Sequence, residues 1–177
     1  MILETERLLL REMVPGDVDD LLAVFSDAET MRFYPKPLDH QGAQAWIERN
    51  RRRYSKDGFG LWALMLKTGR LIGDCGLVAQ EVDGVEAVEI GYHVHRDLWG
   101  QGLATEAARA CRDYGFSRLK RDKLISLIHP ANTASRRVAE KLGMTLVQET
   151  TWCGKHTCLY AIERGPEKAD HWSSNSP

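Results

Sequence analysis

The stretch Arg96–Ala107, RDLWGQGLATEA, decides the fold, because it carries the chain from a strand into a helix through a loop with two glycines. Such a turn leaves backbone N–H groups unpaired at the positive end of the helix dipole, which is a natural seat for an anion. Glycine at positions 100 and 102 removes the side chains that would hold a phosphate at a distance. The stretch therefore predicts a phosphate-binding loop.

The residues on both sides of this loop favour a phosphate site over a plain tight turn, which would use glycine only for its dihedral freedom. The helix after the loop is amphipathic, with an inward stripe of Leu103, Ala104, Ala107, Ala108, Cys111 and Tyr114. The nucleotide pattern GxxxxGK(S/T) is absent. A dinucleotide fingerprint would need glycine or alanine in place of Thr105 and an acidic residue after the next strand, which ends in Ile128 and His129. A Rossmann enzyme is therefore a poor fit.

Length and composition predict one globular domain over residues 1–164, followed by a polar tail over residues 165–177. The 24 basic and 25 acidic side chains give a formal charge of -1, so no global electrostatic argument supports a nucleic acid or an anionic membrane as a partner. Charges interrupt the first apolar residues, and no apolar run approaches bilayer length. We expect a soluble, cytoplasmic protein. The four cysteines lack metal-site spacing, so we expect free thiols and no metal.

The hydrophobic pattern predicts an α/β protein with a sheet of mixed direction. A first strand is expected over residues 3–12, and an antiparallel meander of three strands over residues 60–66, 70–80 and 86–95. The last three strands are expected over residues 123–129, 144–152 and 156–163. Four helices are expected over residues 17–25, 39–54, 102–116 and 132–142.

Four segments in this order resemble the GCN5-related N-acetyltransferases (GNAT), and within them the RimJ/RimL-like branch. They are LETERLLLRE (3–12), VEIGYHVHRD (88–97), WGQGLATEA (99–107) and HPANTASRRVAEKLGM (129–144). The resemblance implies the GNAT acyl-CoA N-acyltransferase fold: a mixed seven-stranded sheet that splays between its fourth and fifth strands, flanked by about four helices. One position departs from the superfamily pattern, because Asp97 stands where glutamine or arginine is usual.

The resemblance implies acetyl-CoA as the acetyl donor, with its pantetheine arm in the gap of the splayed sheet. Its pyrophosphate would lie on the backbone amides of Trp99, Gly100, Gln101, Gly102, Leu103 and Ala104. Asn132 matches an asparagine that bonds near the pantetheine, although a helix N-cap alone would also explain it. Arg96 and Arg137 are candidates for contacts with the phosphates, and Arg137 also fits an ordinary solvated helix face.

Acetyl transfer from a thioester to an amine needs a neutral amine, a donor to the developing oxyanion and a proton for the departing thiolate. Alternation along residues 88–95 puts Val88 and its apolar neighbours toward the core and Glu89 and His93 on the other, less packed side. Glu89 is the first candidate for the base and His93 the second. The alternatives are an exposed strand glutamate for Glu89, and a surface residue or a wall of the amine pocket for His93.

By the same resemblance, Ser135 matches a hydroxyl near the thioester sulfur, and is a candidate proton donor to the thiolate; a local hydrogen bond is the alternative. The resemblance implies direct attack in a ternary complex on a primary amine, either a peptide N-terminus or a small molecule. The acceptor is expected beside the first two helices and their loop, MRFYPKP (31–37). A non-catalytic acyl-CoA sensor is the alternative function, and a homodimer through a shared strand or helix edge is left open.

Overall fold

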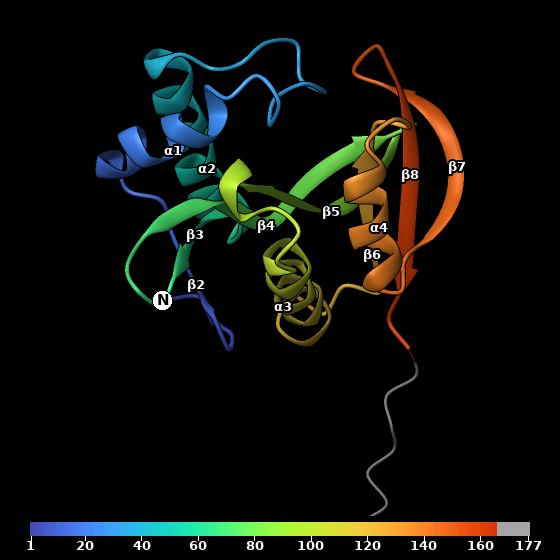
Figure 1. Ribbon diagram of the computed structural model, residues 1–177. Helices are drawn as coiled ribbons and strands as arrows, with labels where there is room; N and C mark the ends of the chain where they lie inside the picture. Colours follow the sequence, from blue (N-terminus) through green and yellow to red (C-terminus); the bar gives the residue numbers. More distant parts are fainter. Residues whose placement is uncertain (166–177) are drawn as a thin grey trace, which may run out of the picture.

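A mixed sheet of eight strands runs through the described part of the chain, which is residues 1–165 of the computed structural model (Figure 1). The strands are β1 Leu3–Glu4, β2 Leu8–Arg11, β3 Leu61–Leu66, β4 Leu71–Val82, β5 Val85–Val94, β6 Lys123–Ile128, β7 Thr145–Trp152 and β8 Lys155–Glu163. Their order across the sheet is β1-β2-β3-β4-β5-β6-β8-β7. The helices are α1 Val18–Phe25, α2 His40–Asp57, α3 Leu103–Ser117 and α4 Thr133–Lys141, with short 3-10 turns η1 Pro15–Asp17 and η2 Arg96–Leu98.

The predicted class, a mixed α/β sheet with four helices, is confirmed, but the sheet has eight strands where seven were expected. The difference lies in residues 3–12, which fold into a hairpin rather than one strand. The Thr5 N–H donates to the Leu8 carbonyl at 2.9 Å, and the Leu8 N–H donates to Thr5 Oγ1 at 3.0 Å. A threonine that bonds the backbone in this way reverses the chain, so β1 pairs with β2.

The predicted splay lies between β5 and β6. Strand β4 pairs with β5 from Gly73 to Val82, which covers the whole of β5, whereas β5 pairs with the parallel β6 at one position, Glu89 with Ile125. Beyond that position the two strands diverge toward their C-terminal ends, as Figure 1 shows. The sheet therefore opens where β5 leads into the glycine loop.

Two hydrophobic clusters hold the helices on the two faces of the sheet. Helices α3 and α4 pack on the face that carries Val88, Ile90 and Val94, as the alternation of β5 predicted. Helices α1 and α2 cover the other face through a second cluster of Leu21, Phe25, Ile47, Leu61, Ala63 and Val78. Because this second layer exists, the face that carries Glu89 and His93 is not the less packed side that we expected, and the side chain of His93 is buried.

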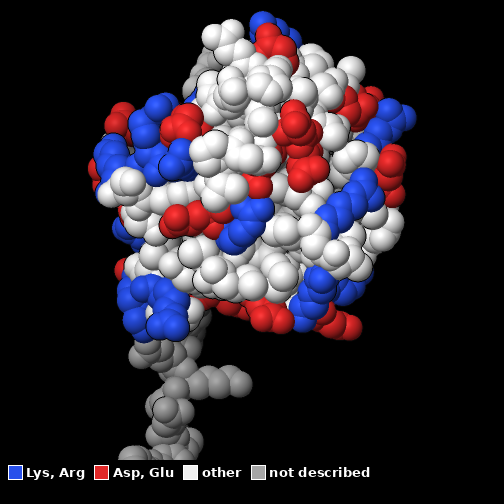
Figure 2. Space-filling view, turned by 90° about the vertical axis from the view of Figure 1, so that its left-hand side faces the viewer, with Lys and Arg blue, Asp and Glu red and all other residues white. Residues whose placement is uncertain are grey.

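Charged side chains are mixed over the side of the molecule that carries α1 and α2. Figure 2 shows Lys and Arg interspersed with Asp and Glu across this view, with no large area of one sign. No helix within residues 1–165 combines the length and apolar character needed to cross a bilayer. The predicted tail lies outside the described residues apart from Gly165, so the domain boundary stays a prediction.

Candidate active site

Both glycines of the loop between β5 and α3 adopt left-handed backbone angles. Gly100 and Gly102 each have φ of +79°, a region that side chains other than glycine rarely adopt. A Cβ built on Gly100 would meet no atom within 4 Å, and one on Gly102 would meet only Arg7 Nη2, at 3.7 Å. The glycines therefore serve both roles considered from the sequence: they allow the turn, and they leave open space beside the backbone.

The start of α3 presents a series of unpaired backbone amides. Gly102 is the N-cap and supplies no side chain to cap the helix. In the described chain, the N–H groups from Gly100 to Thr105 have no protein acceptor, and Glu106 is the first to donate, to the Gly102 carbonyl at 3.0 Å. The Trp99 N–H is engaged with the Arg96 carbonyl at 3.1 Å, so the series begins one residue later than the predicted site. These amides and the positive end of the helix dipole fit an anion such as a pyrophosphate.

Arg7 holds this loop from the N-terminal strands, a role that the sequence did not reveal. Its Nε atom lies 2.6 Å from Glu106 Oε2, and its Nη1 donates to the Gln101 carbonyl at 3.0 Å. Burial raises the pKa of the Glu106 carboxyl, but hydrogen bonds from Thr5 and Arg7 outweigh that effect and leave the pKa below its ordinary value. Arg7 lies in the LETERLLLRE segment, which was the available signal.

The other predicted cofactor residues have defined places. The Trp99 indole donates to the Val94 carbonyl at 2.7 Å, and Arg96 Nη1 reaches Asp27 Oδ1 beyond the end of α1 at 3.5 Å. Arg137 is exposed on α4. Asn132 Oδ1 accepts the Ser135 N–H at 3.1 Å, which is the N-cap bond that its position predicted. Their contacts with a cofactor stay predictions.

Glu89 lies at the point where the sheet begins to open, since it forms the pair that joins β5 to β6. Its side chain is half-buried, and Gln80 Nε2 donates to its Oε2 at 2.7 Å. Burial raises the pKa of the Glu89 carboxyl, while the hydrogen bond from Gln80 and the charge of Arg53 act in the opposite direction. A carboxylate with a raised pKa is a stronger proton acceptor, which suits the predicted base.

Ser135 faces Glu89's strand from the first turn of α4. Tyr92 Oη on β5 donates to the Ser135 carbonyl at 3.0 Å and so joins the strand to the helix. The Ser135 N–H is used by Asn132, whereas its hydroxyl has no hydrogen-bond partner within residues 1–165. The backbone of Ser135 therefore serves the fold, and its hydroxyl is left for another partner.

His93 is the centre of a buried polar chain rather than a surface residue. Its Nδ1 lies 2.7 Å from Asp74 Oδ1, and its Nε2 lies 2.6 Å from the Tyr34 hydroxyl. Asp74 is 0% exposed and accepts a further hydrogen bond from Trp46 Nε1 at 2.8 Å. The rings of Phe25 and Trp46 stand at 5.3 and 5.6 Å from the imidazole. Sequence reasoning found His93 but missed Asp74, whose strand pattern gave no functional signal.

The loop over residues 31–37 crosses the open end of the sheet. Besides the contact of Tyr34 with β5, the ring of Phe33 stacks on His129, just beyond β6, with centroids 4.9 Å apart. Lys155 Nζ at the start of β8 donates to the Phe33 carbonyl at 3.0 Å. In Figure 1 the loop extends from the two N-terminal helices toward the hairpin of β7 and β8. It therefore connects the two diverging strands.

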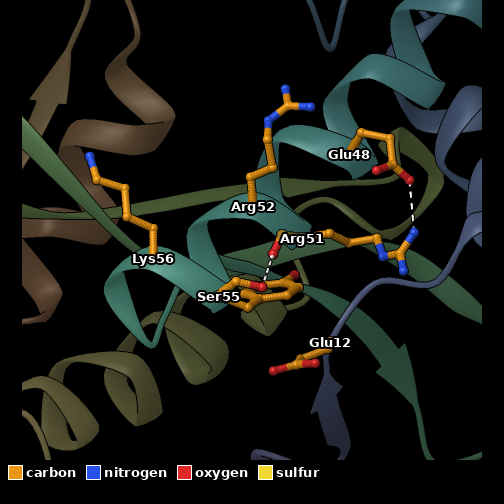
Figure 3. Close-up of a pocket in the computed structure, with 7 residues that line it drawn as sticks. Glu12, Glu48, Arg51, Arg52, Ser55 and Lys56 are labelled. Carbon is orange, nitrogen blue, oxygen red and sulfur yellow. Dashed lines mark hydrogen bonds and ion pairs between the residues drawn. The ribbon is translucent and has the colours of Figure 1, made fainter.

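A separate surface hollow of about 600 Å³ lies against α2 (Figure 3). It is lined by Glu12, Glu48, Arg51, Arg52, Tyr54, Ser55 and Lys56. Arg51 pairs with Glu48 at 2.8 Å, and the charges of both signs are solvated. None of the predicted site residues lines this hollow, so it is separate from the candidate site.

Comparisons with known proteins define the class. Residues 7–145 match the family described as Acetyltransferase (GNAT) domain. The chain is 42% identical over 144 residues to YkkB, an uncharacterized protein of Bacillus subtilis strain 168, covering 80% of this chain and 84% of that protein. It is 32% identical over 143 residues to p20, an uncharacterized N-acetyltransferase of Bacillus licheniformis, covering 79% and 80% respectively.

Solved structures agree with the fold. An acetyltransferase from Agrobacterium tumefaciens strain C58 superposes with a TM-score of 0.80 at 26% identity, covering 92% of this chain and 94% of that one. RimL, a ribosomal L7/L12 α-N-protein acetyltransferase in complex with coenzyme A, has a TM-score of 0.73 at 16% identity, covering 92% and 97%. The chain belongs to the GNAT family of acetyltransferases. The predicted enzyme class, an acyltransferase, is thereby confirmed.

Proposed function

We propose that this enzyme transfers the acetyl group of acetyl-CoA to a primary amine by direct attack within a ternary complex. The observation that carries the proposal is the run of unpaired amides from Gly100 to Thr105, beside the open end of the sheet. Acetyl-CoA supplies an activated thioester. The amides of Gly100, Gln101, Gly102, Leu103 and Ala104 hold its pyrophosphate, with Arg7 fixing the loop behind them.

Arg96, Trp99, Asn132 and Arg137 complete the proposed donor site. The exposed Arg96 and Arg137 side chains supply positive charge near the phosphates. Trp99, which is 46% exposed, offers apolar surface beside the loop. Asn132 keeps its role as helix cap and lies one turn from the Ser135 hydroxyl.

Glu89 and Ser135 divide the proton transfers. Glu89 accepts a proton from the attacking amine nitrogen, directly or through a water molecule, and its raised pKa favours this role. The Ser135 hydroxyl donates a proton to the departing thiolate from the opposite side of the opening. No covalent enzyme intermediate is required.

The acceptor is a primary amine, either a protein N-terminal α-amine or a small molecule. RimL, the structural neighbour, is named for an α-N acceptor on a ribosomal protein, and it supports placing this chain in the RimJ/RimL-like branch. An α-amine has a pKa of about 7.7 to 8.0, against about 10.4 for lysine, so it makes the smaller demand on a base. The cytoplasmic location, the homodimer and the absence of nucleic-acid and membrane partners stay predictions.

Turnover of acetyl-CoA with a panel of amines tests the proposal. N-terminal peptides, amino acids, polyamines and aminoglycosides are each mixed with the enzyme and acetyl-CoA, and free thiol is measured. We expect thiol release that depends on one class of amine. Binding of CoA without turnover of any amine would contradict the enzymatic proposal and favour an acyl-CoA sensor.

A further inference from the structure

The buried hydrogen-bonded chain of Asp74, His93 and Tyr34 has one direction when Asp74 is a carboxylate and His93 a neutral imidazole. Asp74 accepts at both oxygens: from Trp46 Nε1 at 2.8 Å, and from His93 Nδ1 at 2.7 Å. A carboxylate has no hydrogen to donate, so Nδ1 of His93 carries one. In the neutral imidazole Nε2 is then the acceptor, and the Tyr34 hydroxyl is the donor to it at 2.6 Å.

In this direction, the Tyr34 end of the hydrogen-bonded chain has a free hydrogen-bond acceptor. The Tyr34 hydroxyl hydrogen points inward to His93, so the lone pairs of its oxygen point away from the buried chain. The residue Tyr34 is 40% exposed as a whole, whereas His93 is 9% and Asp74 is 0% exposed. Tyr34 is therefore the most exposed of the three residues, and the free lone pair of its hydroxyl oxygen is a hydrogen-bond acceptor.

Tyr34 also lies close enough to Glu89 for the two groups to interact electrostatically. Glu89 and His93 share one face of β5, and Gly91 between them has no side chain. The negative charge of Glu89 acts on the Tyr34 hydroxyl and, after burial, is the next largest cause that raises the Tyr34 pKa above its ordinary value. Phe33, the neighbouring residue, stacks on His129, which leads into the helix of Ser135.

We propose that Tyr34 is a further catalytic residue, whose hydroxyl oxygen contacts the acceptor ammonium and takes its first proton, with His93 and Asp74 as positioning residues. This inference rests on the proposed function. In the step, an N–H bond of the ammonium breaks and an O–H bond forms on Tyr34. The original O–H bond of Tyr34 breaks and an N–H bond forms on His93 Nε2. The amine keeps its electron pair for attack.

The surroundings of His93 stabilise the positive charge that this step transfers to its imidazole. The positive charge passes from the ammonium to the imidazole, which then faces the buried Asp74 carboxylate at 2.7 Å. The other titratable or charged groups that act on this chain within the described residues are Glu89 and Tyr92 on β5 and Arg53 on α2, whose side chain also interacts with the charge of Asp74. From α1 the contact is the apolar ring of Phe25.

Two proton acceptors match the stoichiometry of the reaction. An ammonium nitrogen loses two protons in becoming an amide nitrogen: one before it can attack and one as the amide forms. The chain that ends at Tyr34 takes the first, and Glu89 takes the second. The stoichiometry thus leaves a separate step for each acceptor.

The pH dependence of Tyr34→Phe tests the proposal with a readout that a structural role would not change. At pH below the pKa of the acceptor amine, we expect kcat/KM for the amine to fall about 10²-fold or more, as is usual for loss of acid–base catalysis. The loss should shrink as the pH rises above the amine pKa, because a neutral amine needs no first base. KM for acetyl-CoA should not change.

Tyr54→Phe is the matched control, since Tyr54 bonds the backbone of Leu61 and Met13 rather than His93. A pH-independent loss in Tyr34→Phe, or no loss, overturns this proposal while leaving the proposed function intact. An inactive wild type with every amine overturns both. Nitrogen NMR of the histidines adds a test without turnover: we expect His93 as the Nδ1–H tautomer, and the Nε2–H tautomer would overturn the chain's direction.

Discussion

The Nε atom of Arg7 lies 2.6 Å from Oε2 of Glu106, which ties the N-terminal strands to the first turn of α3. The same guanidinium donates to the Gln101 carbonyl and leaves its Nη2 beside Gly102. Arg7 and Glu106 are separated by 99 positions in the sequence. The loop that we assign to the pyrophosphate is therefore held by the start of the chain as well as by its own helix.

Arg7→Ala should weaken binding of CoA. We expect the dissociation constant of CoA to rise about tenfold, because the loop loses the bond that fixes the Gln101 carbonyl. The guanidinium is 45% exposed, so solvent screens the pair, and the free energy of unfolding should fall by no more than about 1 kcal/mol. Isothermal titration calorimetry with CoA measures the first effect, and urea unfolding the second.

Arg51→Ala is the control, since Arg51 pairs with Glu48 at 2.8 Å with the same 45% exposure but lies on α2, away from the loop. An equal loss of CoA binding in both variants would argue against a role of Arg7 in the donor site.

Gly102→Leu should abolish CoA binding. The substitution forces a side chain into the left-handed region at φ +79° and fills the open space beside the free amides. Gly84→Leu is matched for backbone strain, because Gly84 has φ +77° and open space in the turn between β4 and β5. Both variants should lose stability by thermal melting, but only Gly102→Leu should lose CoA. Retention of CoA by Gly102→Leu would remove the basis of the donor site.

Ser135→Ala tests the proton donor without disturbing the fold, since the hydrogen bonds of Ser135 come from its N–H and carbonyl groups. We expect kcat to fall about 10²-fold with KM for acetyl-CoA unchanged, as for loss of a general acid. Steady-state kinetics of thiol release measure both constants. Thr133→Ala, an exposed change in the same turn of α4, should leave kcat unaltered. Wild-type kcat in Ser135→Ala would assign the proton to another donor.

Glu89→Gln should stabilise the protein at neutral pH. Burial raises the pKa of Glu89 above the ordinary 4.5, so the native state holds this proton more tightly than the unfolded chain does. Stability from this group is therefore present below the ordinary pKa and is lost as the pH rises through the raised pKa of the folded protein. Glutamine does not ionise, so the variant keeps its stability as the pH rises. In urea unfolding, the variant should therefore be more stable than the wild type near neutral pH, and this difference should vanish below pH 4.5.

The exposed Glu86 on the same strand gives the control substitution, Glu86→Gln, for which we expect no pH-dependent gain. If Glu89→Gln changed the free energy of unfolding equally near neutral pH and below pH 4.5, the ionised Glu89 carboxylate would not destabilise the native state.

Local patterns in the sequence predicted much of the donor side. The strand, glycine loop and helix around residues 96–107 follow from short-range signals: alternation, glycine and helix propensity. Asn132 as N-cap follows in the same way, and the structure shows the bond. The exact strand number did not follow, because the turn at Thr5 depends on one side-chain hydrogen bond that a run of apolar residues does not reveal.

The acceptor side was predicted less well. Alternation put Glu89 and His93 on one face of β5, which is correct, but the packing of α1 and α2 on that face could not be seen from the strand itself. His93 was therefore expected on a more open surface than the one it occupies. Phe33 and Tyr34 lie in the loop that was expected beside the acceptor, but the sequence did not reveal their partners, His129 and His93.

By itself the sequence determined the family, the glycine loop and the choice of Glu89 and Ser135 as candidates, because these depend on residue types at short fixed spacings. Only the tertiary structure decided that Arg7 holds the loop and that Asp74, His93 and Tyr34 form one chain. The bonds of that chain join residues 19 and 59 positions apart. Contacts of that kind depend on how the sheet and both helical layers pack, and no local pattern encodes them.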